Sequence, residues 1–232
     1  MSQNISSHEA SKNISSKDKL FQYKNIDDIE VGIDEAGRGC LFGPVCIASV
    51  IWPKTDPENP MIIKDSKKCT EKYRNKCYDY ILDNSICYSI QLIDNDKIDK
   101  ENILKCTLDG MHLCLDELSE KNDFTNILVD GNHFNPYYSK EKDDFVFHEC
   151  VIKGDDKYKS IAAASILAKT YRDNYILKLV EEYPELKKYG IEKNKGYGTK
   201  QHMEAIEKYG ITEWHRKSYS PCKDKVFNQM KG

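Results

Sequence analysis

One short stretch constrains this chain more than any other. It reads Gly-Ile-Asp-Glu-Ala-Gly-Arg-Gly over residues 32–39, at the end of a short apolar run. Neighbouring side chains on a strand point to opposite faces, so Asp34 and Glu35 can converge on one ion only where the strand ends or bulges. The glycines on either side of Arg38 allow such an ending, and the arginine adds a fixed positive charge. The stretch predicts a cation site beside a phosphate or hydroxyl reader, with an exposed acidic turn as the alternative.

The composition bounds the class of protein. The 232 residues fit one large domain, or one domain with extensions, and 39% hydrophobic and 31% charged residues are typical of a globular chain. The net charge of −3 does not suggest a nucleic-acid binder, although an acidic cluster can offset a local basic face. Nine cysteines without a C-x-x-C pair disfavour a zinc site or a secreted disulfide framework. With no apolar signal core and no apolar run long enough to span a bilayer, we expect a cytoplasmic protein without membrane association.

The pattern of apolar and turn residues predicts a mixed α/β domain with a central sheet. We expect strands near 29–33, 42–52, 86–93, 125–129 and 145–152, and helices near 70–84, 100–118, 160–182 and 200–209. Residues 133–144 and the glycine-containing residues 189–199 read as loops. Small residues at 162–165 predict that the long helix lies close to the sheet.

Four acids share one position, where a predicted strand gives way to a glycine-containing turn: Asp34, Glu35, Asp130 and Asp155. Ligands of α/β sheets bind outside strand ends. Four carboxylates brought together would repel one another and raise each other's pKa unless cations neutralised them. Mg²⁺ or Mn²⁺ suits such an all-oxygen site, and two ions about 4 Å apart would clamp a phosphodiester. The alternative is that each Asp-Gly pair is simply a turn.

The chain resembles the type 2 ribonucleases H, or ribonuclease HII, in a series of motifs that come in the family's order. They are residues 34–39 with 43–45, Asp65-Ser66-Lys67-Lys68, Asn102-Ile103-Leu104 with Met111, Val129-Asp130-Gly131-Asn132, Lys153-Gly154-Asp155, residues 161–169 with 172–173, residues 195–199 with His202, and residues 215–219. The resemblance covers about residues 28 to 220.

The resemblance implies an RNase H-like fold: a central mixed β-sheet flanked by helices, with a small C-terminal helical extension. The domain is expected at 26–222, between a disordered polar tail at 1–25 and a short tail at 223–232. The implied activity is endonucleolytic hydrolysis of the RNA strand of RNA–DNA hybrids, with incision 5′ of ribonucleotides embedded in duplex DNA. Water attacks in line with the help of Mg²⁺ or Mn²⁺, two ions with substrate bound, and leaves 5′-phosphate and 3′-hydroxyl ends. A monomer is expected.

Position by position, Asp34, Glu35, Asp130 and Asp155 match the family's catalytic, metal-binding acids. Gly37, Arg38 and Gly39 match the segment that reads the 2′-hydroxyl, and Tyr197 matches the tyrosine that stacks on the following deoxyribose. The hydroxyl is what separates RNA from DNA at one nucleotide. Once the site is in place, three basic residues become candidate phosphate contacts: Lys67, Lys68 and Arg216.

The chain departs from the family pattern in a few places. Cys40 stands where proline is usual, Phe42 replaces a smaller residue, and the segment between Asp130 and the fourth acid is longer. We assign the fourth acid to Asp155 rather than Asp156, because it directly follows Lys-Gly at the right distance before the alanine-rich helix. The single histidines 133, 148 and 202 are left out, because Mg²⁺ prefers oxygen.

Three alternatives stay open. Type 3 ribonucleases H usually carry Lys at the position of Arg38 and a folded N-terminal domain, whereas this chain begins with about 25 polar residues. A catalytically silent hybrid-binding protein would be marked by loss of an acid. A glycine-rich nucleotide-binding domain would show a G-x-G-x-x-G or Walker pattern, and neither is present.

Overall fold

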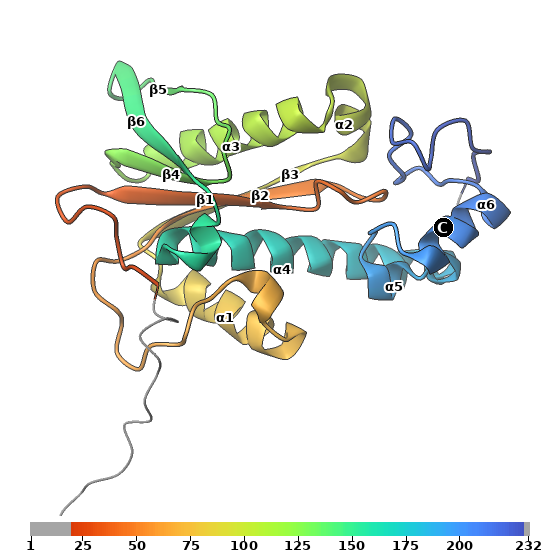
Figure 1. Ribbon diagram of the computed structural model, residues 1–232, viewed down its shortest axis with the longest axis horizontal. Helices are drawn as coiled ribbons and strands as arrows, with labels where there is room; N and C mark the ends of the chain where they lie inside the picture. Colours follow the sequence, from red (N-terminus) through yellow and green to blue (C-terminus); the bar gives the residue numbers. More distant parts are fainter. Residues whose placement is uncertain (1–19, 230–232) are drawn as a thin grey trace, which may run out of the picture.

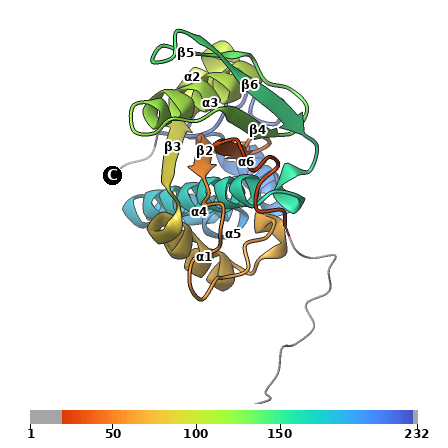
Figure 2. The same cartoon turned by 90° about the vertical axis from the view of Figure 1, so that its left-hand side faces the viewer.

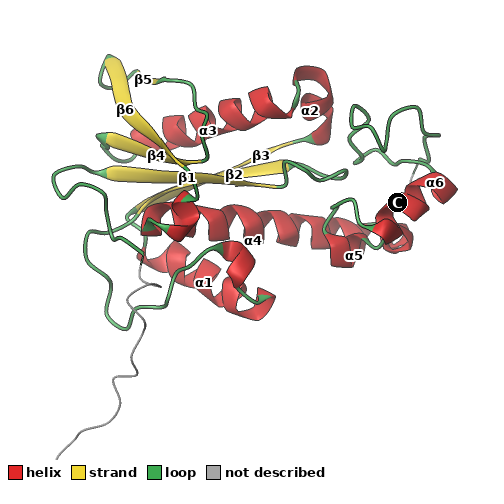
Figure 3. Ribbon diagram, viewed as in Figure 1, coloured by secondary structure: helices red, strands yellow, loops and turns green. Residues whose placement is uncertain are grey.

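The computed structural model describes residues 20–229, and a six-stranded mixed sheet lies at its centre (Figures 1 and 3). The strand order is β3-β2-β1-β4-β6-β5. The strands are β1 (Glu30–Ala36), β2 (Val45–Ile51), β3 (Cys87–Ile93), β4 (Asn126–Asp130), β5 (Tyr137–Ser139) and β6 (Asp144–Val151). β1, β4 and β6 run parallel, so their carboxyl ends meet at one edge. β2, β3 and β5 pair antiparallel with their neighbours.

Helices cover both faces of the sheet. On one face lie α2 (Asn95–Glu101) and α3 (Ile103–Ser119), and on the other lie α1 (Glu71–Asn84) and α4 (Lys159–Glu182) (Figure 2). The strand positions alternate accordingly. Ile33 and Val129 belong to the core beneath α3, while Cys46 and Ala48 belong to the core beneath α4. Hydrophobic burial on both faces holds the sheet between two helical layers.

Helix α4 lies unusually close to β1. An added Cβ at Gly32 would come 2.2 Å from the main-chain carbon of Ser160, so only glycine fits at this contact. The small residues at positions 162–165 are all buried, which lets the helix approach its neighbours closely. This confirms the expectation from the sequence, and it brings the start of α4 to the strand that carries Asp34.

The remaining elements form the C-terminal helical part, at the right of Figure 1. They are the short helices η3 (Pro184–Tyr189) and α5 (Ile191–Asn194), followed by α6 (Lys200–Tyr209) with Thr199 as its N-cap. Two further 3₁₀ turns, η1 (Ser66–Lys68) and η2 (Gly154–Asp156), lie beside the carboxyl ends of the parallel strands. A separate apolar cluster around Phe42, Ile176 and Tyr189 joins this part to the end of α4.

The structure corrects four local predictions. The loop expected at 189–199 contains the short helix α5 (Ile191–Asn194). β1 does not end at Ile33 but runs on to Ala36, through both acids. The helix expected at 100–118 is two helices, separated at Asn102, whose φ of 69° breaks the first and whose side chain caps the second. The loop expected at 133–144 contains the edge strand β5. Its three residues are too few to show an alternating pattern in the sequence.

The tails predicted at 1–25 and 223–232 fall only in part on described residues. Residues 1–19 and 230–232 lie outside the described residues. Phe21, assigned to the tail, exchanges main-chain hydrogen bonds with Lys157 and Lys159. At the other end, Ile211 exchanges main-chain hydrogen bonds with Val226 and Asn228. Within residues 20–229, no helix is both long and apolar enough to cross a bilayer.

Candidate active site

Three of the predicted acids come together at the carboxyl edge of the parallel strands. Asp34, Asp130 and Asp155 each offer one carboxylate oxygen, and these oxygens all lie within 4.8 Å of one another. Asp34 comes from β1, Asp130 ends β4, and Asp155 lies in the 3₁₀ turn η2 after β6. The group thus spans three neighbouring parallel strands.

Strand register explains why Asp34 and Asp130 meet. Ile33 pairs with Val129, and both side chains enter the core beneath α3. The next residue on each strand therefore faces α4 instead, because side chains alternate. Asp130 Oδ1 also accepts a hydrogen bond from the main-chain N–H of Gly154, over 2.6 Å. That bond fixes the turn that carries the third acid.

Glu35 lies on the opposite face of β1 from Asp34, because the strand continues through both residues. Its carboxylate pairs with Arg38 Nη1 over 3.3 Å. Together with Arg38, Asp130 and the start of α3, it lines a hollow of about 180 Å³. Asp130, at the strand end, borders both this hollow and the three-acid group. Glu35 is therefore next to the three-acid group, on the α3 side of the sheet, with Asp130 between them.

The electrostatics of the acids favour a bound cation. Burial raises the pKa of Asp34 well above its ordinary value, and the nearby charges of Glu35 and Asp130 raise it further. Burial also raises the pKa of Glu35, with Arg38 opposing it, and that of Asp155, where Asp130 adds to the effect. Crowded carboxylates with these shifts are costly when ionised and bare. Hard divalent cations with oxygen ligands fit this donor set.

The structure separates Asp155 from its neighbour. Asp155 is buried and belongs to the acid group, whereas Asp156 points to the surface and pairs with Lys68. Lys67 Nζ lies 3.8 Å from Asp155, and most of its side chain is exposed. Both lysines follow Asp65, whose side chain caps η1 by accepting the N–H of Lys67. The two ammonium groups therefore border the acids from the η1 side.

The turn after β1 is buried at its first residue and exposed to solvent at the next two. Gly37 is buried with φ +93°, and an added Cβ there would come 2.1 Å from Arg172 Nε. Arg38 and Gly39 are exposed. A side chain at residue 37 would be strained by its φ and would collide with the buried arginine. The glycine is therefore required by both conformation and packing.

Tyr197 lies close to this turn, on the loop before α6. The residue is 40% exposed, and its ring centroid lies 5.2 Å from Lys169 Nζ and 6.0 Å from the guanidinium carbon of Arg172. Burial and the neighbouring Cys40 raise the pKa of Tyr197 to about 12, so the hydroxyl stays protonated at neutral pH. Cation–π contacts with Lys169 and Arg172 thus hold the tyrosine ring in place while part of it faces solvent.

Arg216 is not a phosphate contact, contrary to the prediction. Its side chain has no exposed surface, and its nitrogens donate to the main-chain carbonyls of Gly37, Arg38 and Gly43. A basic residue next to aromatic residues suggested a surface contact, but sequence alone could not show that the carbonyls of a distant turn would surround it. Arg172 was not singled out by sequence reasoning. It is equally buried and donates to the carbonyls of Phe42, Pro44 and Lys195.

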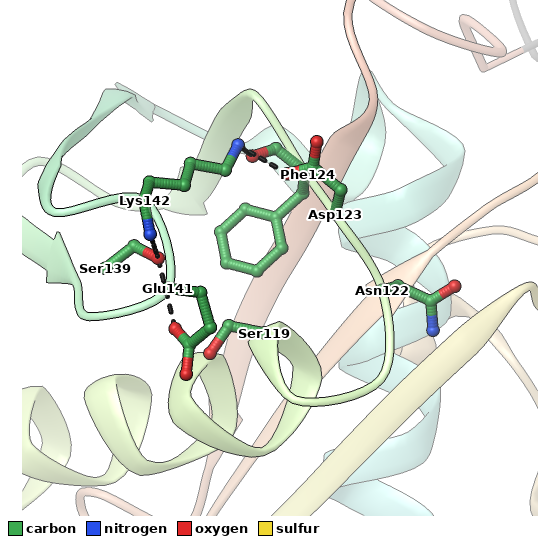
Figure 4. A pocket seen from close by; sticks show the side chains of 7 residues that line it. All are labelled: Ser119, Asn122, Asp123, Phe124, Ser139, Glu141 and Lys142. Atoms are coloured by element: carbon green, nitrogen blue, oxygen red, sulfur yellow. Dashed lines mark hydrogen bonds and ion pairs between the residues drawn. The ribbon is translucent and has the colours of Figure 1, made fainter.

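A larger hollow of about 480 Å³ lies elsewhere, at the beginning of β4 and so at the other end of that strand from Asp130 (Figure 4). Phe124, Ser139 and Glu141 are among the residues that line it. Its one ammonium group, on Lys142, already pairs with Asp123 and with the carbonyl of Phe124. The positive charge at this hollow is thus already paired, and the candidate chemistry stays at the acid group.

Comparisons with known proteins agree with this geometry. A family model described as Ribonuclease HII matches residues 31–222. The ribonuclease HII of Christiangramia forsetii is 45% identical over 207 residues, covering 89% of this chain and 98% of that protein. That of Bacteroides thetaiotaomicron is 45% identical over 209 residues, covering 90% and 98%. The crystal structure of ribonuclease H2 from Pyrococcus horikoshii superposes with a TM-score of 0.66 at 25% identity, covering 83% of this chain and 94% of that one.

The family resemblance and the expected fold class are confirmed. The sheet, its flanking helices and the group of acids at its carboxyl edge all lie within the matched residues. Such enzymes depend on divalent metal ions, and the acids of this chain have the oxygen donors for them. The chain therefore belongs to the ribonuclease HII family and is a ribonuclease H, an endonuclease that hydrolyses RNA in RNA–DNA hybrids.

Proposed function

We propose that this enzyme cuts the RNA strand of RNA–DNA hybrids and also incises duplex DNA on the 5′ side of single embedded ribonucleotides. The products carry 5′-phosphate and 3′-hydroxyl ends. The observation that carries the proposal is the meeting of Asp34, Asp130 and Asp155 within 4.8 Å at an edge bordered by lysines. A group of this kind suits phosphodiester hydrolysis by water and needs no nucleophilic side chain.

The three acids, with Glu35 beside Asp130, would hold Mg²⁺ or Mn²⁺, and we propose two ions when substrate is bound. When bound, the ions supply positive charge that neutralises the phosphate and favours in-line attack by water. The chain's own residues do the positioning. Gly154 fixes one oxygen of Asp130 by its N–H, and the N–H of Glu35 fixes one oxygen of Asp34 over 2.7 Å. Each of these carboxylates therefore keeps its second oxygen for a ligand.

The lysines at the rim suit the substrate backbone. Lys67 and Lys68 are largely exposed and lie at the acids through their pairs with Asp155 and Asp156. An ammonium group there would attract phosphates on both sides of the scissile bond. Such contacts add affinity that does not depend on sequence.

Two further features support cutting at a single ribonucleotide. In the Gly37-Arg38-Gly39 turn, the exposed residues Arg38 and Gly39 can offer main-chain groups to a 2′-hydroxyl, which DNA lacks. The half-exposed ring of Tyr197 can stack on the sugar of the next nucleotide, where an extra hydroxyl would interfere. All these groups come from one chain, which supports a proposal that the monomer is active. Gel filtration with in-line light scattering gives the mass of each eluted species, and cleavage assays on the same fractions test whether the monomer is active.

The test is a cleavage assay on three end-labelled duplexes that share one sequence: all DNA, DNA with one ribonucleotide, and an RNA–DNA hybrid. Each is incubated with Mg²⁺, with Mn²⁺ or with a chelator. We expect a cut 5′ of the ribonucleotide and along the hybrid with metal, and none in all-DNA. Phosphatase treatment should retard the downstream product by removing its 5′-phosphate. No cut at the ribonucleotide with either metal would refute incision, and a 3′-phosphate would refute the proposed chemistry.

A further inference from the structure

We propose that Arg216 is a positioning residue for ribonucleotide recognition. It orients two peptide planes of the Gly37-Arg38-Gly39 turn so that their N–H groups face the substrate's 2′-hydroxyl. The inference rests on the proposed function, which assigns recognition of that hydroxyl to this turn. It adds a residue that lies behind the turn and does not touch the nucleic acid.

The guanidinium of Arg216 grips the turn from the protein interior. Its Nη2 donates to the carbonyl of Gly37 over 2.7 Å and its Nη1 to the carbonyl of Arg38 over 2.8 Å. Its Nε donates to the carbonyl of Gly43 over 3.0 Å. Within residues 20–229, no carboxylate pairs with Arg216, so carbonyl dipoles hold its charge. The rigid fork of arginine suits two adjacent carbonyls, which a lysine could not hold together.

Because the peptide group is planar, the hydrogen bonds to the carbonyls also fix the N–H groups on the opposite side of the turn. In a trans peptide, the carbonyl of one residue and the N–H of the next lie in one plane and point in opposite directions. Fixing the carbonyl of Gly37 therefore fixes the N–H of Arg38, and fixing that of Arg38 fixes the N–H of Gly39. Both residues are exposed, and neither N–H donates a hydrogen bond to the described part of the chain. Two oriented donors thus face outward.

Tyr219 supports the same plane independently. Its hydroxyl donates to the carbonyl of Arg38 over 2.7 Å and lies 3.0 Å from Arg216 Nη1. Arg172 touches Gly37 from another side, but its donors go to Phe42, Pro44 and Lys195 instead. Arg216 with Tyr219 therefore fixes the reading turn itself, while Arg172 fixes the loops beside it.

A purely structural role for Arg216 would weaken binding of every duplex alike or lower stability alone. A positioning role lowers the preference for a ribonucleotide and leaves affinity for DNA unchanged. The readout is therefore the ratio of two dissociation constants, for all-DNA duplex and for the same duplex with one ribonucleotide. Fluorescence anisotropy without metal measures both without cleavage.

The variants are Arg216→Lys and Tyr219→Phe, with Arg74→Lys as the matched control. Arg74 is also a buried arginine, but it pairs with Asp173 over 3.1 Å and does not touch the turn. Misplacing one or two N–H donors predicts a loss of ribonucleotide preference of about 5- to 30-fold in Arg216→Lys and about 2- to 5-fold in Tyr219→Phe. The control should keep the wild-type preference even where its thermal stability falls.

A folded Arg216→Lys protein with wild-type preference overturns the inference, and so does equal weakening on both duplexes. If that variant does not fold, Tyr219→Phe decides the question, and an unchanged preference overturns it. A wild-type enzyme that neither prefers nor cuts the ribonucleotide-containing duplex would instead refute the proposed function, and the inference with it. Loss of preference confined to the two turn variants supports the inference.

Discussion

Asp130 Oδ1 lies 2.6 Å from the main-chain nitrogen of Gly154, and this bond joins the end of β4 to the turn that carries Asp155. An acid that binds a cation with one oxygen can thus hold a second acid in place with the other. The arrangement gives Asp130 two tasks, which a substitution can separate. An amide keeps an oxygen acceptor but removes the charge.

Asp130→Asn should therefore keep the fold and abolish cleavage. We expect a loss of about 1,000-fold or more in kcat, because removal of one neutral donor to a transition state already costs about 100- to 1,000-fold. Binding of the RNA–DNA hybrid should survive, because the amide still accepts the N–H of Gly154. Parallel cleavage and gel-shift assays measure the two effects. Full activity would remove Asp130 from the site.

Asp34→Asn should stabilise the metal-free protein while it inactivates the enzyme. Burial and the charges of Glu35 and Asp130 raise the pKa of Asp34 above that of the unfolded chain. Stability is therefore lost as the pH rises above the ordinary pKa of about 3.9, and the loss is complete above the raised pKa. Removing the charge should raise the free energy of unfolding by about 1–3 kcal/mol at pH 7. Urea unfolding in chelator measures this. A less stable variant would contradict the proposed repulsion.

Asp155→Asn and Asp156→Asn form a matched pair of neighbours. Asp155 belongs to the acid group, whereas Asp156 faces solvent and pairs with Lys68. We expect a loss of about 100-fold or more for the first and less than about threefold for the second, since an exposed ion pair contributes little. Cleavage rates across a Mg²⁺ titration compare them. The reverse order would move the fourth ligand to Asp156.

Tyr197→Ala should impair cutting at a single ribonucleotide more than cutting within long RNA tracts, by about 10-fold in relative kcat/KM. Under the proposed function the ring would stack on the deoxyribose only at an RNA–DNA junction, and an aromatic ring stacked on a nucleic-acid base contributes roughly 1–3 kcal/mol. Tyr197→Phe keeps the ring above Lys169 and should retain most of the preference. Equal losses on both substrates in the alanine variant would refute sugar stacking.

Acid should destabilise the C-terminal part through a buried pair of imidazoles. His202 Nε2 and His215 Nε2 lie 3.1 Å apart, and His215 Nδ1 accepts from the N–H of Thr212. Burial and the neighbouring His202 lower the pKa of His215 to about 3. The unfolded chain, with an ordinary pKa near 6.5, binds the proton first, so stability is lost as the pH falls below about 6.5.

From pH 7.5 to 5.5, His215 alone should cost about 1.4 kcal/mol of unfolding free energy. Urea titrations at the two pH values measure the loss, and His215→Asn serves as the control that lacks the titrating group. The variant should be less stable at both pH values and should show a smaller pH dependence by about that amount. An equal pH dependence in both proteins would show that His215 protonates normally.

The acids could be found from sequence because each lies close to a glycine-containing turn that follows a predicted strand. The sequence did not show which of these acids lie together in one group and which lies on the other face of the sheet. The sequence predicted that β1 ends before Asp34, but pairing with β2 extends the strand to Ala36 and sends Glu35 to the opposite face. That pairing depends on residues 45–51. Sequence periodicity locates this strand but does not show which of its residues pair with which residues of β1.

Long-range packing explains the other differences. Arg216 reads as a surface cation because its neighbours are polar and aromatic, and only the folded chain brings the carbonyls of residues 37–43 around it. The break between α2 and α3 depends on one residue, Asn102, whose positive φ leaves no periodic signal. Local patterns did predict the helices α1 and α6, whose starts are set by the nearby capping residues Thr70 and Thr199.

Helix α4 lies against both the acid group and the turn of residues 37–39. Ser165 lies near the acids and Arg172 lies against Gly37, and seven residues of helix separate them by about 10 Å. A continuous helix of 24 residues keeps a constant length, so it fixes the distance between the acid group and the turn of residues 37–39. The position of the cut relative to the recognised sugar should then be a constant of the molecule, unchanged by temperature, salt or the surrounding sequence.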